Sequence, residues 1–178
     1  DIGSSTTDFA YIVDGHQQNV SLFGDTNLGG GLIDELILSR AMAASRDQKA
    51  LEAVFEESPA WRSYCELEAR RLKESYFLDE EKWAEAPLCR TLTVCYDEPL
   101  ALELSIGGAS IRKMVEQPIP ALGGRSFVGC LKDALCAAVE VSRSCPPEVV
   151  ILTGGASRMA FFQQACREAF GGALLVLC

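Results

Sequence analysis

The C-terminal thirty residues constrain the fold more than any other part of this chain. Residues 149–152 and 174–177 are uninterrupted apolar runs, and between them lie a turn at Gly154-Gly155 and a helical segment that a second glycine pair ends. Strand, glycine turn, helix and strand in this order predict a β-α-β unit with two parallel strands. Because both runs are apolar throughout, we expect a sheet buried on both faces, as in α/β proteins. Ser157 is predicted to cap the helix.

The composition is that of a globular protein. The chain has 178 residues, of which 48% are hydrophobic and 23% charged, enough to form one domain or two small ones with a real core. Acidic residues number 25 and basic residues 16, and the net charge of −9 argues against nucleic acid as a partner. The apolar runs are too short to span a bilayer, so no membrane partner is expected.

The eight cysteines predict neither a zinc site nor a disulfide framework. No two of them are spaced as C-x-x-C, and the chain has a single histidine to assist them. Several cysteines fall on helix faces that otherwise carry core residues. We therefore expect reduced, mostly buried thiols in a cytoplasmic protein.

Hydrophobic periodicity predicts the remaining elements. They are strands at 7–13 and 18–23 joined by an Asp14-Gly15 hairpin, a helix over 28–45, charged helical segments over 47–86 with a break near Ser58-Pro59, strands at 91–96 and 100–106, and helices over 109–117 and 125–143. The middle of the chain is more charged and more helical than its flanks. We interpret 47–117 as an α+β insertion into one α/β unit formed by 1–46 and 118–178. The flank strands at 7–13, 18–23, 149–152 and 174–177 are expected to share one sheet.

One inserted helix carries an apolar stripe with polar residues beside it. The stripe consists of Trp61, Cys65, Ala69, Leu72 and Tyr76, and the polar set of Glu68, Arg71 and Ser75. Polar groups at the edge of a core are well placed to hydrogen-bond a ribose or a base. The alternative is one ion pair on a solvated helix face.

Three glycine-bearing turns are candidate phosphate or nucleotide sites, because such turns and helix N-termini present backbone N–H groups to anions. Residues 1–8 place hydroxyls between Asp1 and Asp8, either of which could hold the water shell of Mg²⁺. Residues 24–31 precede a helix. In residues 154–158 the guanidinium of Arg158 could stack on an adenine. Each turn can also be purely structural.

The order of these motifs resembles a known family. Asp1-Ile2-Gly3 through Asp8, then Gly24-Asp25-Thr26-x-Leu28-Gly29-Gly30-x-x-x-Asp34, then Val149-Val150-x-Leu152-x-Gly154-Gly155-x-Ser157-Arg158 resemble the nucleotide-binding domain of the 70-kDa heat-shock proteins, the DnaK-type chaperones. That family belongs to the superfamily of actin-like ATPases and sugar kinases. The resemblance implies lobe II alone: an actin-like ATPase (ribonuclease H-like) inner subdomain, IIA-like, at 1–46 and 118–178, and an inserted outer subdomain, IIB-like, at 47–117.

The resemblance also implies a role for individual residues. Around the β- and γ-phosphates it places Gly3, Ser4, Ser5 and Thr6. The catalytic residues would be Asp1, Asp8 and Thr6, with the two carboxylates near Mg²⁺ and its waters. Gly29 and Gly30 would lie beside the ribose and phosphate. The adenosine contacts would be Gly154, Gly155 and Arg158, with Glu68, Arg71 and Ser75 on the outer helix that closes over adenine.

The implied function is that of an ATP-dependent chaperone. The parent protein would bind ATP or ADP with Mg²⁺, hydrolyse ATP and use lobe motion to control peptide binding. Its partners would be lobe I of the same protein, which supplies the other phosphate loop and the catalytic lysine, and a co-chaperone or nucleotide-exchange factor on the outer subdomain. The isolated lobe is expected to be inactive.

Two alternatives to the chaperone remain. The family usually has glycines where Ser4 and Ser5 stand, an acidic residue in place of Gly31 and a basic one in place of Leu72. These departures suit a divergent, non-catalytic actin-like scaffold. Another actin-like ATPase or a sugar-kinase-type enzyme is the second alternative.

Overall fold

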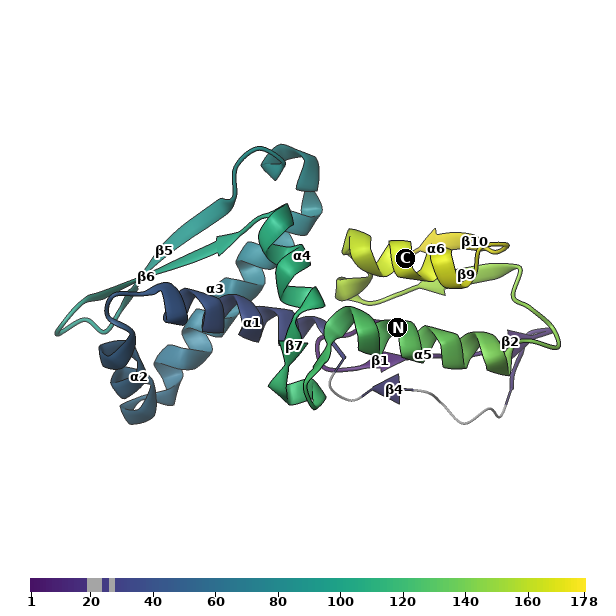
Figure 1. Cartoon of the computed structure of the whole chain (residues 1–178), viewed down its shortest axis with the longest axis horizontal. Helices are drawn as coiled ribbons and strands as arrows, with labels where there is room; N and C mark the ends of the chain where they lie inside the picture. The colour runs from purple at the N-terminus through teal and green to yellow at the C-terminus, as the bar shows by residue number, and fades with distance from the viewer. Residues whose placement is uncertain (19–23, 26–27) are drawn as a thin grey trace. The chain divides into compact units, whose positions relative to one another are not determined.

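The chain is a mixed α/β protein that divides into two compact units (Figure 1). The computed structural model describes residues 1–18, 24–25 and 28–178. The first unit comprises Asp1–Leu32 and Val115–Cys178, and the second comprises Ile33–Met114. Helices α1 (Gly30–Ala44) and α4 (Gly108–Glu116) each contain one of the two boundaries. The second unit is thus inserted into the first in sequence, and it begins inside α1 rather than after it.

Pairs of short strands and two helices make up the first unit. Its elements are β1 (Thr7–Asp8), β2 (Ile12–Val13), β3 (His16–Gln17), β4 (Gly24–Asp25), β7 (Pro118–Ile119), a 3₁₀ turn at Pro120–Leu122, β8 (Arg125–Ser126), α5 (Phe127–Val141), β9 (Val149–Leu152), a 3₁₀ turn at Gly155–Arg158, α6 (Ala160–Ala169) and β10 (Leu174–Leu177). Helices α5 and α6 lie side by side. Phe127 and Phe162, both fully buried, meet edge to face between them.

The predicted hairpin at Asp14-Gly15 is confirmed, but its strands are shorter than expected. β2 and β3 pair antiparallel around a turn in which Asp14 has φ 50° and Gly15 has φ 76°. This backbone matches the twist of a two-residue hairpin. The partner strand expected at 18–23 falls mostly on residues 19–23, which lie outside the described residues.

The expectation of one sheet for the flank strands is wrong for the strands that the structure describes. β1 pairs with β4, β2 with β3, and β9 with β10, each as a separate two-stranded sheet. The chain turns back on itself immediately after Ile2, which forms a bridge to Thr7. It is therefore Ile2, rather than the segment 7–13, whose backbone hydrogen-bonds to the segment after β9.

The C-terminal β-α-β unit is confirmed in its topology and corrected in two details. β9 and β10 are parallel and in register from Leu174 opposite Val149 to Leu177 opposite Leu152. One face of this pair is open to solvent, because Val149, Ile151 and Leu174 are 46%, 58% and 65% exposed. Burial on both faces, predicted from the apolar runs, is therefore wrong.

Ser157 does not cap α6. It lies within the 3₁₀ turn that follows Gly154, and its hydroxyl donates to the carbonyl of Gly154 at 2.6 Å. Helix α6 begins only after Met159. The chain tightens into a 3₁₀ turn before the helix begins, and this turn uses the hydroxyl that was expected at the cap.

A helix and a hairpin form the centre of the second unit. Its elements are most of α1, then α2 (Gln48–Glu57), α3 (Pro59–Leu78), a 3₁₀ turn at Glu80–Trp83, β5 (Leu88–Val94), β6 (Leu100–Ile106) and most of α4. The predicted break between α2 and α3 is confirmed at Ser58, with Pro59 in the first helical position that proline favours.

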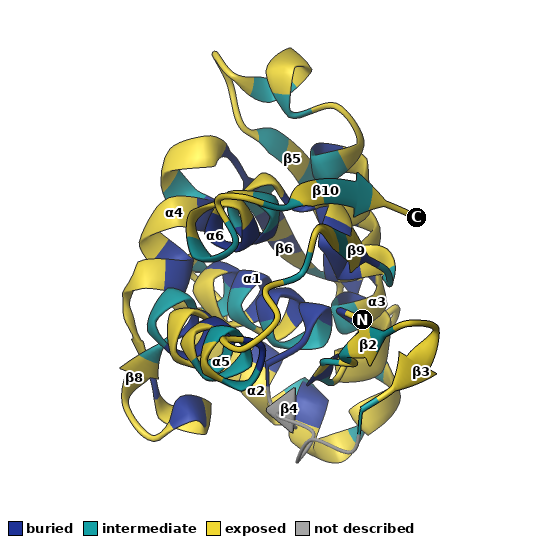
Figure 2. Cartoon of the chain, turned by 90° about the vertical axis from the view of Figure 1, so that its right-hand side faces the viewer, coloured by how far each residue is buried: buried dark blue, intermediate teal, exposed yellow. Residues whose placement is uncertain are grey.

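The apolar stripe predicted on α3 forms the core of the second unit. Its residues are buried except for Trp61, which is half-buried and meets Tyr64 and Tyr96 edge to face. One face of the β5–β6 hairpin packs against it and is also buried, with Leu92, Val94, Leu102, Leu104 and Ile106. Alternation along each strand brings these side chains to one face. Figure 2 colours the chain by burial, with the buried residues in dark blue.

The cysteines are less buried than expected. Only Cys65, Cys130 and Cys166 are buried, whereas Cys89, Cys136, Cys145 and Cys178 are exposed and Cys95 is intermediate. All eight are free thiols. The expectation of mostly buried thiols is therefore wrong: on helix α5 Cys130 faces inward and Cys136 outward, and Cys89, Cys145 and Cys178 are exposed on other segments. Burial raises the pKa of the Cys65 thiol to about 11.

In the part of the chain that the structure describes, no helix combines the length and the apolar character that crossing a membrane requires.

Candidate functional site

A tight turn at residues 3–6 is the centre of the predicted phosphate loop. The N–H of Gly3 donates to the carbonyl of Thr6 at 2.9 Å and closes the turn. Ser4 and Ser5 are exposed at its tip. The hydroxyl of Thr6 donates to Oδ2 of Asp8 at 2.7 Å, which orients that carboxylate.

The three glycine-bearing segments predicted to form one site meet in the first unit. The N–H of Ile2 donates to the carbonyl of Thr153 at 2.8 Å, and the N–H of Ala156 donates to the carbonyl of Ile2 at 3.2 Å. On the other side of the turn, the hydroxyl of buried Thr7 donates to the carbonyl of Leu28. Residues from the beginning and the end of the sequence therefore form one backbone-linked cluster.

Glycine is required where these segments approach each other. A β-carbon at Gly29 would lie 2.5 Å from the carbonyl oxygen of Ser4, and one at Gly31 would lie 2.8 Å from it. At Gly154 a β-carbon would overlap the carbonyl oxygen of Ile2, and its φ of 88° also disfavours any other residue. By contrast, a β-carbon at Gly155 would meet nothing within 4 Å.

Backbone carbonyls of the turn cap the start of helix α1. The N–H of Gly30 donates to the carbonyl of Gly3 at 2.9 Å, and the N–H of Gly31 donates to the carbonyl of Ser4 at 2.6 Å. These two N–H groups are among those a helix N-terminus would otherwise offer to an anion. A phosphate at this site would therefore approach the exposed tip at Ser4 and Ser5 rather than the end of α1.

The carboxylates of Asp1 and Asp8 are both exposed and lie on neighbouring backbone. The N–H of Asp8 donates to the carbonyl of Asp1 at 2.8 Å, and the hydroxyl of Thr153 donates to Oδ1 of Asp1 at 3.1 Å. Among the described residues, no three acidic, histidine or cysteine side chains come together as a metal cage. Two carboxylates fit Mg²⁺, which keeps several waters and takes its other ligands from phosphate oxygens.

A cavity of about 690 Å³ opens beside Asp1 and Asp8 within the first unit. Its remaining walls come mainly from apolar residues of α5, β9 and the segment 9–12. Gly154, Gly155 and Arg158 lie outside its walls. The cavity therefore adjoins the acidic end of the predicted site but not the adenosine turn.

The predicted adenosine turn is held from α6. The side-chain amide of Gln163 donates to the carbonyls of Ser157 and Arg158, at 3.3 and 3.2 Å. The Arg158 side chain is exposed. A fixed backbone with an exposed guanidinium suits stacking on a flat ring.

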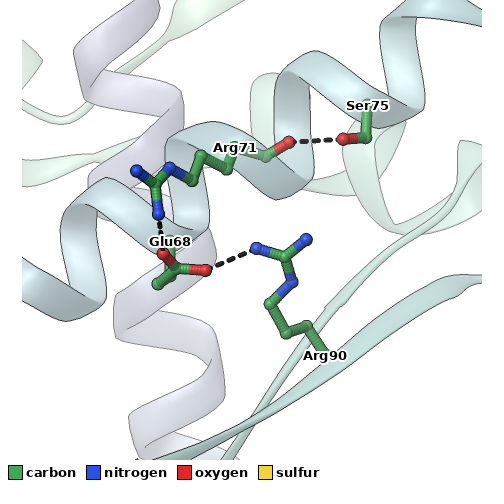
Figure 3. Close-up of polar contacts among 4 residues, drawn as sticks. All are labelled: Glu68, Arg71, Ser75 and Arg90. Carbon is green, nitrogen blue, oxygen red and sulfur yellow. Dashed lines mark hydrogen bonds and ion pairs between the residues drawn. The ribbon is translucent and has the colours of Figure 1, made fainter.

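In the second unit, α3 brings Glu68, Arg71 and Ser75 together (Figure 3). Nη1 of Arg71 lies 2.5 Å from Oε1 of Glu68, and the hydroxyl of Ser75 donates to the backbone carbonyl of Arg71 at 2.8 Å. The side chain of Glu68 is 8% exposed and that of Arg71 is 57% exposed. The ion pair weighed as the alternative to a binding role is thus present, and it leaves more than half of the Arg71 side chain exposed.

The sequence analysis missed Arg90, on β5, which pairs through Nη1 with Oε2 of Glu68. Burial of Glu68 favours its neutral form, but the hydrogen bonds and charges of Arg90 and Arg71 outweigh that effect and lower its pKa below the usual value. The strand expected at 91–96 began after Arg90, and the alternation of Leu88, Leu92 and Val94 could have placed Arg90 on the inner face of the strand but could not have named its partner.

A buried ion pair was also missed. Nζ of Lys73 lies 2.6 Å from Oδ1 of Asp34, and Nε of Arg70 lies 3.3 Å from Oδ2. Burial raises the pKa of Asp34 and lowers that of Lys73, in each case against the attraction of the partner. Asp34 is the last residue of the second motif, and it pairs with helix α3 within the second unit.

The predicted site residues thus fall into two groups. The phosphate turn, the start of α1 and the adenosine turn belong to the first unit, and Glu68, Arg71 and Ser75 belong to the second. No protein-family model matches the chain, and no curated protein matches it significantly.

Proposed function

We propose that this chain is lobe II of the ATPase domain of a heat-shock-70-like chaperone and binds the adenosine and phosphate side of ATP or ADP. The observation that supports this proposal is the convergence of the three motif segments. The turn at 3–6 hydrogen-bonds both to the start of α1 and, through Ile2, to the turn after β9. The parts of one nucleotide site must lie close together, and these three segments do.

The phosphate end would be formed by the exposed turn. Gly3, Ser4, Ser5 and Thr6 would contact the β- and γ-phosphates, and Asp1 and Asp8 would hold Mg²⁺ through water. Bound Mg²⁺ would neutralise the charge of the phosphate oxygens. Asp8, whose carboxylate the Thr6 hydroxyl holds at 2.7 Å, would orient the attacking water.

The adenosine end would use a fixed backbone and two arginines. Gly154 and Gly155 would allow a flat ligand to approach the main chain, and Arg158 would stack on the base. Glu68, Arg71 and Ser75 would hydrogen-bond the base and ribose, with Gly29 and Gly30 beside the ribose and phosphate.

The proposal includes partners and a compartment. The actin-like ATPase fold of the parent protein would be completed by lobe I of the same chain. The unit at 33–114 would receive a co-chaperone or nucleotide-exchange factor. Eight free thiols suit a reducing cytoplasm.

The test is made on the complete protein, because phosphoryl transfer needs both lobes. We expect it to bind ATP in the presence of Mg²⁺ and to hydrolyse it. Asp8→Asn should lower kcat by about a hundredfold or more while ATP affinity changes only a few-fold, because a residue that orients water acts in the transition state. Asp14→Asn, in the exposed hairpin turn, is the matched control and should leave kcat unchanged. Absence of ATP binding by a folded complete protein would refute the proposal.

A non-catalytic scaffold is the second candidate, and one observation favours it. The N–H groups of Gly30 and Gly31 and both carboxylate oxygens of Glu68 are already bonded within the protein. Such a lobe would keep the fold and bind a partner without nucleotide. Calorimetry with ATP separates the two functions, since the scaffold predicts no heat of binding from a fully folded sample.

A further inference from the structure

Arg90 occupies a position where a charged side chain needs a partner. It lies on the face of β5 that carries buried Leu92 and Val94, and its register partner on β6 is fully buried Leu104. The Arg90 side chain is 40% exposed, so part of it is removed from water. A partly desolvated guanidinium is stable only when its donors are satisfied.

Glu68 satisfies Arg90 and Arg71 at the same time. One carboxylate oxygen contacts Arg90, and the other lies 2.5 Å from Nη1 of Arg71 (Figure 3). Helix α3 supplies Glu68 and Arg71, while the hairpin supplies Arg90. The carboxylate is thus held from two elements, and its orientation decides where the Arg71 guanidinium points.

Removal of Arg90 would release this arrangement. Oε2 of Glu68 would lose its partner in a buried environment, and a buried unpaired acceptor is unfavourable. The nearest remedy is a two-point pairing of the whole carboxylate with Arg71, the geometry that arginine and carboxylate prefer. That pairing would consume further donors of Arg71, whose side chain is 57% exposed in the present arrangement.

We infer that Arg90 is a positioning residue for the adenosine end of the site: by engaging one oxygen of Glu68, it keeps the Arg71 guanidinium free to meet the base. This inference rests on the proposed function, in which Arg71 contacts adenine. It assigns the role to a residue of the hairpin that no nucleotide motif contains. The role is confined to the base and ribose, because the proposed function assigns Arg71 to adenine and the phosphates to the turn at 3–6.

The test uses the complete protein and measures separately how tightly it binds the adenosine part and the phosphate part of ATP. ATP affinity is measured by calorimetry, and adenosine and inorganic tripolyphosphate are measured as competitors of ATP. Arg90→Gln should weaken ATP and adenosine about tenfold, equivalent to about 1.4 kcal/mol, and leave tripolyphosphate within twofold. Arg90→Lys keeps the positive charge but lacks the planar guanidinium with its fixed N–H donors, so its loss of ATP and adenosine affinity should be smaller than that of Arg90→Gln.

Arg62→Gln is the matched control. Arg62 also lies on α3 and pairs with a glutamate, Glu66, at 2.9 Å, but on an exposed part of the helix. This variant should leave all three affinities unchanged. Melting temperatures of every variant are measured in the same samples, so that a general loss of folding is recognised.

A double-mutant cycle tests whether Arg90 affects ATP binding through Glu68. If Arg90 acts through that carboxylate, Arg90→Gln should have no further effect on ATP affinity in a Glu68→Gln background. Equal loss of adenosine and tripolyphosphate binding, or undiminished ATP binding by Arg90→Gln, would overturn the inference while leaving the proposed function intact. Failure of the wild-type protein to bind ATP would refute the proposed function and this inference with it.

Discussion

Gly154 combines two constraints at a single residue. Its φ is 88°, and a β-carbon there would overlap the carbonyl oxygen of Ile2. We expect Gly154→Ala to lower the free energy of unfolding by about 3 kcal/mol, because the strain cannot be relieved without moving the N-terminal segment. Urea denaturation measures this loss.

The adjacent residue is the control for that prediction. A β-carbon at Gly155 meets nothing within 4 Å, and its φ is not positive. Gly155→Ala should change the free energy of unfolding by about 0.5 kcal/mol or less. Similar losses for the two variants would contradict the close approach of Ile2 to this turn.

Glu68 is expected to make the stability depend on pH. Its pKa is lowered in the folded chain, so its contribution is complete above the usual glutamate range and is lost as the pH falls through the lowered value. Glu68→Gln should cost roughly 1 kcal/mol at neutral pH, a small value because both arginines are partly solvated. The difference between wild type and variant should shrink as the pH falls below the usual glutamate range. Denaturation curves recorded from neutral to acid pH measure it, and a constant difference would contradict the ion-pair assignment.

At the scale of elements, neighbouring residues of β9 face opposite environments. Leu152 is 6% exposed and Ile151 is 58% exposed. Leu152→Ala should lower the free energy of unfolding by about 2–4 kcal/mol, because it leaves a cavity in the core. Ile151→Thr should cost less than about 1 kcal/mol. Chemical denaturation of both variants tests which face is covered, and a larger loss for Ile151→Thr would reverse the assignment.

The amphipathic elements were predictable because their periodicity reflects burial directly. The stripe on α3, the break at Ser58 and the parallel pairing of β9 with β10 all follow from local patterns. The segment 7–13 was mispredicted as one strand because its two ends pair with different strands, β1 with β4 and β2 with β3, and alternation along a segment does not specify its partners. Ser157 was mispredicted as a cap because 3₁₀ and α-helical starts share the same sequence signals.

The segments that meet in the candidate site could be picked out in the sequence by their glycines. The turns at 3–6, 29–31 and 154–155 were identified because close backbone contact requires glycine at several of these positions. Arg90 was not identified, since its partner Glu68 lies on another element and the pairing arises only when the hairpin packs on α3. Charged pairs between elements are a property of tertiary structure, and local sequence patterns do not contain them.

At the scale of the whole molecule, the chain supplies one side of the proposed site. It contributes one phosphate turn, one adenosine turn and the carboxylates Asp1 and Asp8, which are exposed. Phosphates held from one side remain in water, where each charged contact is worth little. We therefore expect these 178 residues alone to show no measurable ATP hydrolysis and to bind nucleotide at about millimolar affinity.

Phosphate-release assays and calorimetry on the purified chain test this expectation. Turnover that disappears in Asp8→Ala would show that the catalytic site is complete within these residues. Turnover that persists in Asp8→Ala would come from a contaminating enzyme.

The division into two units determines what optical probes can report. Both tryptophans of the chain, Trp61 and Trp83, belong to the unit at 33–114. Tryptophan fluorescence therefore does not report on the unit that carries the glycine turns. Far-ultraviolet circular dichroism, in contrast, registers helices of both units. If the two signals change at different denaturant concentrations, the units unfold in separate steps, and a fluorescence midpoint describes only the inserted one.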